Sequence, residues 1–385
     1  MSVLNRFGQS IPPVFLADRL KAMRQKKWSL AAFTGLTSLP LVALVVLWLC
    51  FAGTHEMWVA VLILGLYLAF QVVYGLYQLS FGTVQGKLIR PTRRGQLLLI
   101  STFWGAFPAA LFAIWLLPGW LEPSAGSLPS FHWIFTWAGV CFALAAVVVV
   151  LLYEPGDRAA PQVVPKRGKK RGNLADVLRA LRGDANLRRL VLVAMLFGSC
   201  LIVFPHYQAL AMQKLELPWM SLMLFVVAQN VAVGVFSLVV GPLADRRGNR
   251  LTLRFLIFGS AIAPAFAASL LCMPDEFKWL AANVCWMIFI FLGITPLVLR
   301  ILINYTLEIC QPAEHPRYLS TVSLCVAVPF LFSPLVGWAV DAISFQFVFL
   351  LTVCLLVLSG LMTFRLDEPR HRVQEGEAPA PTPGD

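Results

Sequence analysis

The sequence consists of long apolar stretches separated by short polar segments. Ten stretches are long enough to cross a bilayer, for which a helix needs about 20 apolar residues. They lie at 29–52, 57–80, 96–117, 131–153, 190–211, 219–241, 255–273, 279–303, 318–340 and 344–364, with Arg300 as the one formal charge inside them. Backbone polar groups in lipid must be paired within the protein, and a β-barrel would require short alternating strands. The pattern therefore predicts an all-α polytopic membrane protein with about ten transmembrane helices.

The composition and the placement of charge support this class and exclude others. The chain is 59% hydrophobic and only 13% charged, whereas soluble domains carry about 25% charged residues. The net charge of +12 does not indicate a nucleic-acid partner, because the basic residues form short runs between apolar stretches. If the N-terminus is cytoplasmic, 28 of the 31 Lys and Arg fall on the inner side. This asymmetry predicts cytoplasmic termini and, as the setting, a bacterial inner membrane.

A basic segment divides the chain into four stretches and six. We expect an N-terminal bundle over 1–153, a cytoplasmic linker over 154–189, a C-terminal six-helix bundle over 190–367 and a disordered tail over 368–385. Within the linker, 173–181 reads as a short amphipathic helix capped by Asn173. The linker serves either as a solvated connection or as a contact with anionic lipid.

The two halves contain a sequence repeat. Leu-Ala-Asp-Arg stands before the first stretch, at 16–19, and again before the seventh, at 243–246. The stretches that follow share a Gly and a Pro at equal spacing, Gly35 with Pro40 and Gly259 with Pro264. Repeated halves are common in secondary transporters. Two stretches precede the second copy and none precedes the first, so we expect two helices to be missing at the start, with Met1 near the inner end of the second.

The residues around the second copy carry a family resemblance. The run Gly-Pro-Leu-Ala-Asp-Arg-Arg-Gly-Asn-Arg at 241–250 resembles the loop signature of the major facilitator superfamily. Pro334, Gly337 and Asp341 resemble the ending of that family's eleventh helix. The resemblance implies two helical bundles around a central cavity and transport by alternating access, here in a four-plus-six arrangement.

The motif residues are the candidates for gating: Gly241, Asp245, Arg246, Gly248, Arg250, Asp18 and Arg19. Gly241 permits close backbone approach and Gly248 a tight turn. Asp245 can accept hydrogen bonds from arginines or from the N-terminus of a neighbouring helix. The resemblance implies that such contacts latch the two halves on the cytoplasmic side. The alternative is a basic loop that only sets topology, and the first copy, at Asp18, lacks the leading glycine.

The resemblance also implies which polar residues line a substrate path: Gln71, Tyr74, Gln78, His206, Gln229, Asn230, Arg300 and Asn304. Polar groups inside membranes are costly and often functional. Simpler roles stay open. Arg300 can snorkel to the inner surface, Gln229 and Asn230 can join helices, and His206 can be a satisfied local group.

The chain shows no motif for catalysis or for a cofactor. It has no Ser/His or His/Asp/Glu cluster, no phosphate-binding loop and no metal-ligand spacing, and its eight cysteines form no CxxC pair and suit packing. No acid lies at the centre of a stretch, which weakens a proton-antiporter assignment. We predict a non-enzymatic secondary transporter for a small solute, with a proton or another ion as an open coupling partner. The alternative is a non-transporting scaffold, receptor or assembly factor.

Overall fold

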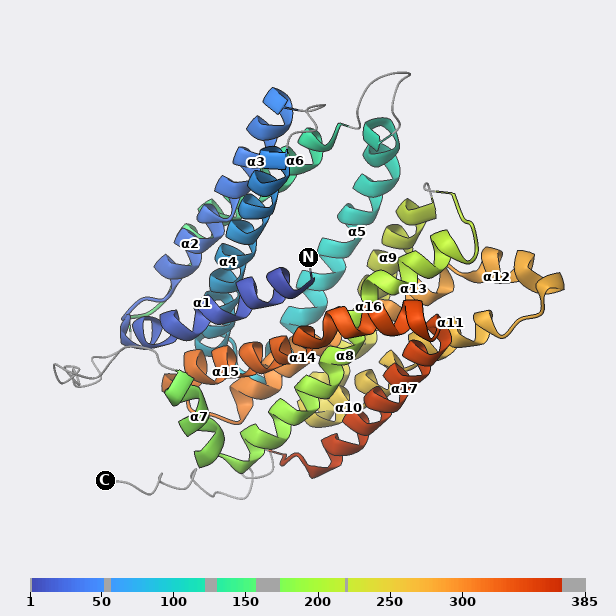
Figure 1. Cartoon of the computed structure of the whole chain (residues 1–385). Coiled ribbons are helices and arrows are strands. Elements are labelled where there is room, and N and C mark those ends of the chain that lie inside the picture. The colour runs from blue at the N-terminus through green and yellow to red at the C-terminus, as the bar shows by residue number, and fades with distance from the viewer. Residues whose placement is uncertain (1, 52–56, 122–129, 157–173, 219–220, 369–385) are drawn as a thin grey trace. The chain divides into compact units, whose positions relative to one another are not determined.

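The computed structural model describes residues 2–51, 57–121, 130–156, 174–218 and 221–368 (Figure 1). These residues form α-helices and short 3₁₀ turns, with no strand among them, as the sequence predicts. Ten helical stretches of the described residues are long and apolar enough to cross a membrane: Lys27–Phe51, Met57–Leu88, Pro91–Leu116, Phe131–Leu151, Ala185–Gln213, Ser221–Arg247, Asn249–Leu271, Met287–Glu308, Pro312–Ala342 and Phe345–Arg365. The chain is an integral membrane protein, and the predicted order of spans is confirmed.

Some predicted span ends are wrong. The second span continues to Leu88 instead of ending at 80, because Gly82, Thr83 and Val84 in its last turns are buried and packing outweighs their low helix propensity. The eighth begins at Met287, because the preceding residues form the separate helix α12 (Lys278–Val284). Hydropathy alone does not define either helix boundary.

Three of the interrupted spans break four residues before a proline, which lacks a backbone donor. The breaks separate α2 (Lys27–Leu36) from α3 (Ser38–Phe51), α10 (Asn249–Ser260) from α11 (Ile262–Leu271), and α13 (Met287–Leu292) from α14 (Ile294–Glu308). Each first helix ends at the residue whose carbonyl the next proline, Pro40, Pro264 or Pro296, would have to bond. The Gly and Pro spacing shared by the two halves therefore produces the same break in both.

The described helices form two compact units. Unit 1 comprises Met1–Leu88, Ala109–Ala180 and Ala313–Ser333, and unit 2 comprises Ile89–Pro108, Leu181–Pro312 and Pro334–Asp385. The units do not follow the chain order. The first part of α5 (Arg94–Leu121) belongs to unit 2, and α15 (His315–Ala327) belongs to unit 1. Each half of the sequence thus contributes a helical segment to the other unit.

In unit 1, α4 (Met57–Leu88) and α6 (Phe131–Leu151) pack on the α2–α3 span. Helix α1 (Ser2–Ala22) lies along both α4 and α15. Met1 lies outside the described residues, but the expectation that a helix ends there and leaves 16–19 in a loop is wrong, because all of 2–22 form α1. The apolar side chains Val14, Ala17 and Leu20 are buried, while polar residues such as Arg6 lower the mean hydropathy that would reveal the helix.

The linker contains the predicted amphipathic helix, α7 (Leu174–Gly183). Val177 and Ala180 are buried, while Leu178 is exposed. The proposed cap Asn173, the basic run 166–171 and the predicted disordered tail from 369 onward lie outside the described residues.

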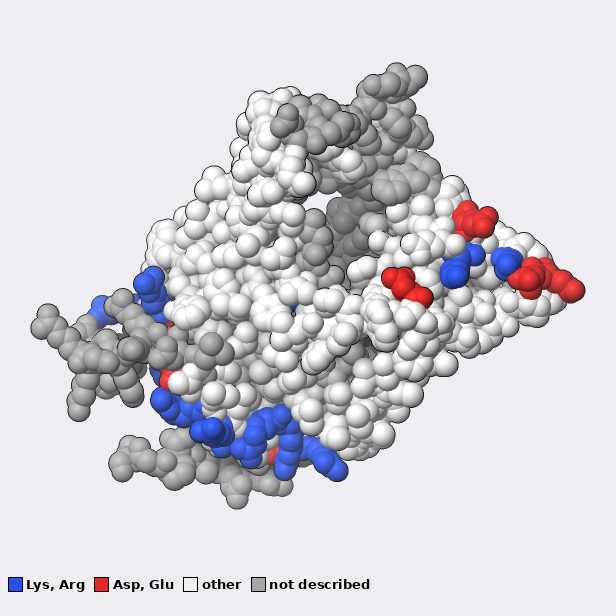
Figure 2. Space-filling model, viewed as in Figure 1, with Lys and Arg blue, Asp and Glu red and all other residues white. Residues whose placement is uncertain are grey.

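In unit 2, α8 (Ala185–Gln213) packs lengthwise on α17 (Phe345–Met362), as Figure 1 shows. α9 (Ser221–Arg247) contacts α10, α13 and α14, and α16 (Ser333–Ala342) precedes α17. Stacked rings fill the core, with centroids 4.2 Å apart for Phe225 and Phe289 and 5.0 Å for Tyr207 and Phe349. Figure 2 shows Lys and Arg gathered where α8 begins and α17 ends, a second set of charged side chains at the opposite end of unit 2, and an uncharged surface between them. This distribution suits helices that cross an apolar layer.

The cysteines do not all have the packing role that we expected. Cys200, Cys285 and Cys325 are buried and Cys310 is half-buried. The other four are exposed: Cys50, Cys141, Cys272 and Cys354. Cys50, Cys141 and Cys354 lie on outward faces of spans, which hydropathy does not distinguish from core faces, and Cys272 follows the end of α11.

A buried carboxylate joins three helices of unit 1. Glu154, which follows α6, is 3% exposed. It accepts hydrogen bonds from the backbone N–H of Lys26 (3.0 Å) and Lys27 (2.6 Å), where α2 begins, and from Nζ of Lys87 (2.6 Å) in the last turn of α4. Unpaired N–H groups at a helix start favour such a negative acceptor.

Replacing Glu154 with Gln should destabilise unit 1 by about 2–4 kcal/mol, because Lys87 and the start of α2 lose a buried charged acceptor. We expect thermal unfolding of the purified protein in detergent to shift down by several degrees. The exposed Glu276→Gln, which removes the same charge, should leave the transition in place. Equal melting temperatures for Glu154→Gln and wild type would show that this carboxylate does not stabilise the fold.

Candidate functional site

The last turn of α9 crosses the first turn of α5 with backbone touching backbone. A Cβ added to Gly95 would lie 2.2 Å from the carbonyl oxygen of Gly241. A Cβ added to Gly241 would lie 2.7 Å from the carbonyl oxygen of Gly95. Since no side chain fits, glycine is required on both sides of the crossing. The crossing lies within unit 2 and joins helices from opposite halves of the sequence.

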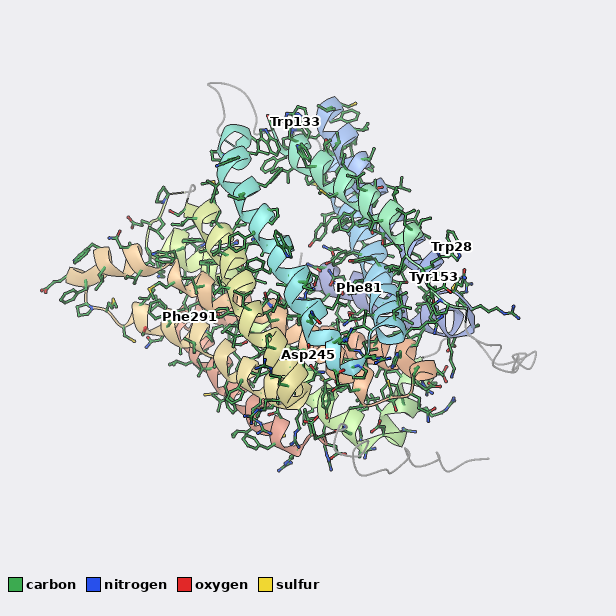
Figure 3. All side chains as sticks on the ribbon, turned by 180° about the vertical axis from the view of Figure 1, so that it is seen from behind. Trp28, Phe81, Trp133, Tyr153, Asp245 and Phe291 are labelled. Atoms are coloured by element: carbon green, nitrogen blue, oxygen red, sulfur yellow. The ribbon has the colours of Figure 1, made fainter. Side chains whose placement is uncertain are left out.

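Asp245 completes this crossing electrostatically. One carboxylate oxygen accepts the N–H of Gly95 and the other accepts the N–H of Gln96, both at 2.7 Å. Figure 3 labels Asp245 at the end of α9, beside the start of α5. The carboxylate therefore binds two of the N–H groups that no carbonyl in α5 can satisfy, at the positive end of the helix dipole. This is one of the two partner types that the sequence suggested for Asp245.

The turn after Asp245 is closed by an acidic residue that the sequence pattern did not single out. Gly248 has a φ of +88°, which favours glycine, and a Cβ there would lie 3.0 Å from a carboxylate oxygen of Glu368. Glu368 also lies 3.3 Å from Nε of Arg250, whose Nη1 donates to the carbonyl of Leu366 at 3.0 Å. A signal was present, since a Glu-Pro pair follows α17 just as Glu154 and Pro155 follow α6. Arg246 is exposed on the last turn of α9.

The first copy of the motif lies in a matching setting in unit 1. Asp18 and Arg19 are exposed in the last turn of α1, which packs on α15. Lys21 pairs with Glu314, in the 3₁₀ turn Pro312–Glu314 that leads into α15. A corresponding turn, Pro91–Arg93, leads into α5. Helices α1 and α15 thus repeat the relation of α9 and α5.

The predicted path residues on α4 differ in exposure. Gln71 is buried and its Oε1 accepts from Nε2 of Gln9 in α1 at 2.8 Å. Tyr74 is half-buried and stacks on Phe70 with centroids 5.8 Å apart, while Gln78 is exposed. The structure therefore joins Gln71 to a neighbouring helix and leaves Gln78 outside that contact.

The predicted path residues of unit 2 are dispersed. His206 is half-buried with its ring 6.5 Å from that of Phe345, and Gln229 is half-buried on α9. The side-chain amide of Asn230 donates to the carbonyl of Val226 in its own helix at 2.8 Å, so its described bond does not join two helices. Asn304 is buried on α14. These residues do not form one cluster among the described contacts.

Arg300 has a partner on another helix. Its Nη1 donates to Oγ of Ser101 in α5 at 3.1 Å, while Arg300 itself is exposed. Among the described residues Arg300 forms no ion pair with a carboxylate. A second arginine at membrane depth, Arg6 in α1, is not apparent from the sequence, because mean hydropathy does not reveal its helix.

Comparisons with known proteins agree with this fold. The sequence profile of the Major Facilitator Superfamily matches residues 12–306 and 231–383, and no curated protein matches the chain by sequence. A bacterial homologue of the iron transporter ferroportin, in the outward-facing state with soaked iron, is similar at 15% identity and a TM-score of 0.66, covering 94% of this chain and 88% of that one. A variant of the E. coli fucose:proton symporter FucP is similar at 14% identity and a TM-score of 0.66, covering 95% of this chain and 89% of that one. The proton:xylose symporter XylE bound to 6-bromo-6-deoxy-D-glucose is similar at 15% identity and a TM-score of 0.65, covering 95% of this chain and 85% of that one.

The contact of Asp245 with α5 predicts a local change in hydrogen exchange. In Asp245→Asn, the amides of Gly95 and Gln96 should exchange faster, by about tenfold for each 1.4 kcal/mol of protection that is lost. Mass spectrometry of peptides covering 94–99 measures this. Asp275→Asn is the matched control, since it removes the same charge from an exposed pair with Lys278. Unchanged exchange at 94–99 in Asp245→Asn would contradict the contact.

Proposed function

The chain belongs to the major facilitator superfamily, and on that premise we propose that it carries a small solute across a membrane by alternating access. In this proposal both termini are cytoplasmic, and the crossing of α9 with α5 forms part of the cytoplasmic gate. The gate residues are those of the motif: Gly241, Asp245, Arg246, Gly248 and Arg250, with Asp18 and Arg19 in the first copy.

The observation that carries the proposal is the pair of hydrogen bonds from Gly95 and Gln96 to Asp245, both at 2.7 Å. They join segments from opposite halves of the sequence by polar contacts, which water can replace when the segments separate. Two charged hydrogen bonds at a helix start are worth about 2–5 kcal/mol in sum. A difference of that size favours one state strongly and still allows the other to be populated.

The repeated contact of α1 with α15 supports the same reading. It uses the other copy of the motif, and the Lys21–Glu314 pair at its end is exposed to water. Exposed ion pairs contribute about 0–1 kcal/mol, so this contact can open at little cost. A gate with two related contacts suits a protein whose halves rock about a central solute site.

The similar structures do not identify the solute of this protein. Those proteins are named for iron, fucose and xylose, which share little chemistry, and identities of 14% and 15% carry the fold alone. We propose six residues near the path: Gln71, Tyr74, His206, Gln229, Arg300 and Asn304. Gln78 and Asn230 are the weaker candidates, because Gln78 is exposed and the amide of Asn230 bonds within its own helix.

Transport can be tested in liposomes before the solute is identified. Proteoliposomes are incubated with a defined mixture of sugars, amino acids, organic acids and nucleosides, and their contents are then measured by mass spectrometry. We expect at least one solute to enter faster than into protein-free liposomes. Asp245→Asn should slow this entry by about tenfold, the effect of about 1.4 kcal/mol on the stability of one state. Asp275→Asn should transport like wild type.

Contents that match those of protein-free liposomes for every class of solute would support the non-transporting alternative. If the solute enters Asp245→Asn proteoliposomes as fast as wild-type ones, the protein is a transporter but Asp245 is not part of its gate. Insertion of each variant into the membrane is checked by its yield and by its elution as a single species.

A further inference from the structure

Arg6 lies beside the middle parts of two spans of unit 1. One turn further along α1, Gln9 bonds to Gln71, which is near the midpoint of the α4 span. Arg6 itself lies over the ring of Phe330, 5.2 Å from its centroid, near the middle of the span Pro312–Ala342. All of these residues belong to unit 1. An ionised side chain at this depth is costly and usually marks a functional position.

Arg6 has no carboxylate partner among the described residues. Its one hydrogen bond is long, 3.5 Å from Nη1 to Oε1 of Gln9. Two other cations of unit 1 do have carboxylate partners, Lys21 with Glu314 and Lys87 with Glu154. A guanidinium presents five N–H donors, and Arg6 is half-buried, so the donors that do not face Gln9 are open to a solvent molecule or a solute. The position can therefore accept an anion that the described side chains do not supply.

The groups around Arg6 suit an anion with an apolar body. The side chains of Tyr67 and Tyr74 lie in the neighbourhood of Arg6. Tyr74 belongs to a set of rings, 5.8 Å from Phe70 and 6.4 Å from Phe142. Amides of Gln9 and Gln71 lie on one side, and Arg6 is half-buried, so part of it is open to a solute. A planar guanidinium binds carboxylate or phosphonate oxygens in pairs, while the rings accept apolar surface.

The distribution of charge along the spans favours the same class of ligand. Among the described residues, Arg6 and Arg300 lie away from the ends of the spans they pack with, and both are cations. A third cation within a helix, Arg254, bonds Thr363 at the end of α17 and so lies near the surface. The described acids lie at helix ends or in loops. Low-dielectric surroundings strengthen the attraction of each such cation for an anion.

We propose that Arg6, with Gln9, Gln71, Tyr67, Tyr74 and Phe330, binds the charged group of an amphipathic organic anion, a carboxylate or phosphonate with an apolar body. The inference rests on the proposed function, since it names the class of solute that the transporter carries. Arg6 holds the acid group, and the rings hold the body.

The test measures thermal unfolding of the full purified chain in phosphatidylcholine nanodiscs. Benzoate, phenylphosphonate and octanoate are titrated beside benzamide, dimethyl phenylphosphonate and octanamide. At least one acid should raise the melting temperature to a plateau, while its neutral counterpart does not, because only the acid binds the folded state. Arg6→Gln should raise the apparent Kd of that acid by about tenfold or more, the loss of one charged hydrogen bond or more.

Two further variants separate binding from folding. Arg6→Lys retains the positive charge but lacks the planar guanidinium with its paired N–H donors. It should bind the acid more weakly while its melting temperature without ligand equals that of wild type. If Arg6→Gln does not fold, Arg6→Lys is the variant that tests the proposal. Arg24→Gln removes one positive charge from the exposed segment after α1 and should bind like wild type. No stabilisation by any of the three acids, equal stabilisation by the neutral compounds, or wild-type affinity in Arg6→Gln and Arg6→Lys would overturn the assignment.

The failure of this inference is distinguishable from the failure of the proposed function. Uptake of a neutral solute without binding of any acid would overturn the anion site and leave transport in place. Binding of an acid through Arg6, without uptake of any solute, would overturn transport alone. If phosphatidylglycerol added to the discs raises the melting temperature through Arg6 and the soluble acids do not, the site binds a lipid headgroup and the solute assignment fails.

Discussion

The structure depends on carboxylates placed where helices begin. The first turns of a helix have N–H groups without intrahelical partners, and these groups need an acceptor wherever water is scarce. Glu154 supplies one at the start of α2, Asp245 at the start of α5, and Asp184 at the start of α8, where it accepts from the N–H of Asn186 and Leu187. This need explains why the described acids gather at helix ends in a chain that has so few of them.

The same interaction has different consequences in different settings. Glu154 is fully enclosed, and its partners belong to its own half of the sequence, so the contact fastens three helices permanently. Asp245 is half-buried, and it binds a helix from the other half. Water can reach Asp245 and replace its partners at moderate cost, which is the physical requirement for a reversible gate. Burial and partner thus distinguish a structural carboxylate from a candidate gating carboxylate.

The cations divide in a similar way. Those at helix ends pair with acids or backbone carbonyls, as Arg250 does with Glu368 and Leu366. Arg6 and Arg300 lie within the apolar layer, and their described partners are hydroxyl, amide or ring groups. A charge in that position is stabilised by a counter-ion, and the anion proposed as the solute supplies one. The described acids lie outside the middle of the spans, so they do not neutralise these two arginines. The proposed solute class follows from this distribution of charge.

The sequence by itself determined the class of protein, the order of its ten spans, the Gly and Pro spacing shared by the two halves and the motif at 241–250. These follow from local chemistry: continuous apolar stretches must be helices in lipid, and a proline lacks the donor that a helix needs. Only the tertiary structure decided that 2–22 form a helix, that Asp245 reaches Gly95 and Gln96, and that no described carboxylate reaches Arg6. Helix α1 is stabilised by packing on α4 and α15, and the partners of Asp245 lie far along the chain. No local pattern specifies which distant backbone or side chain will be near, because that is set by how the helices pack.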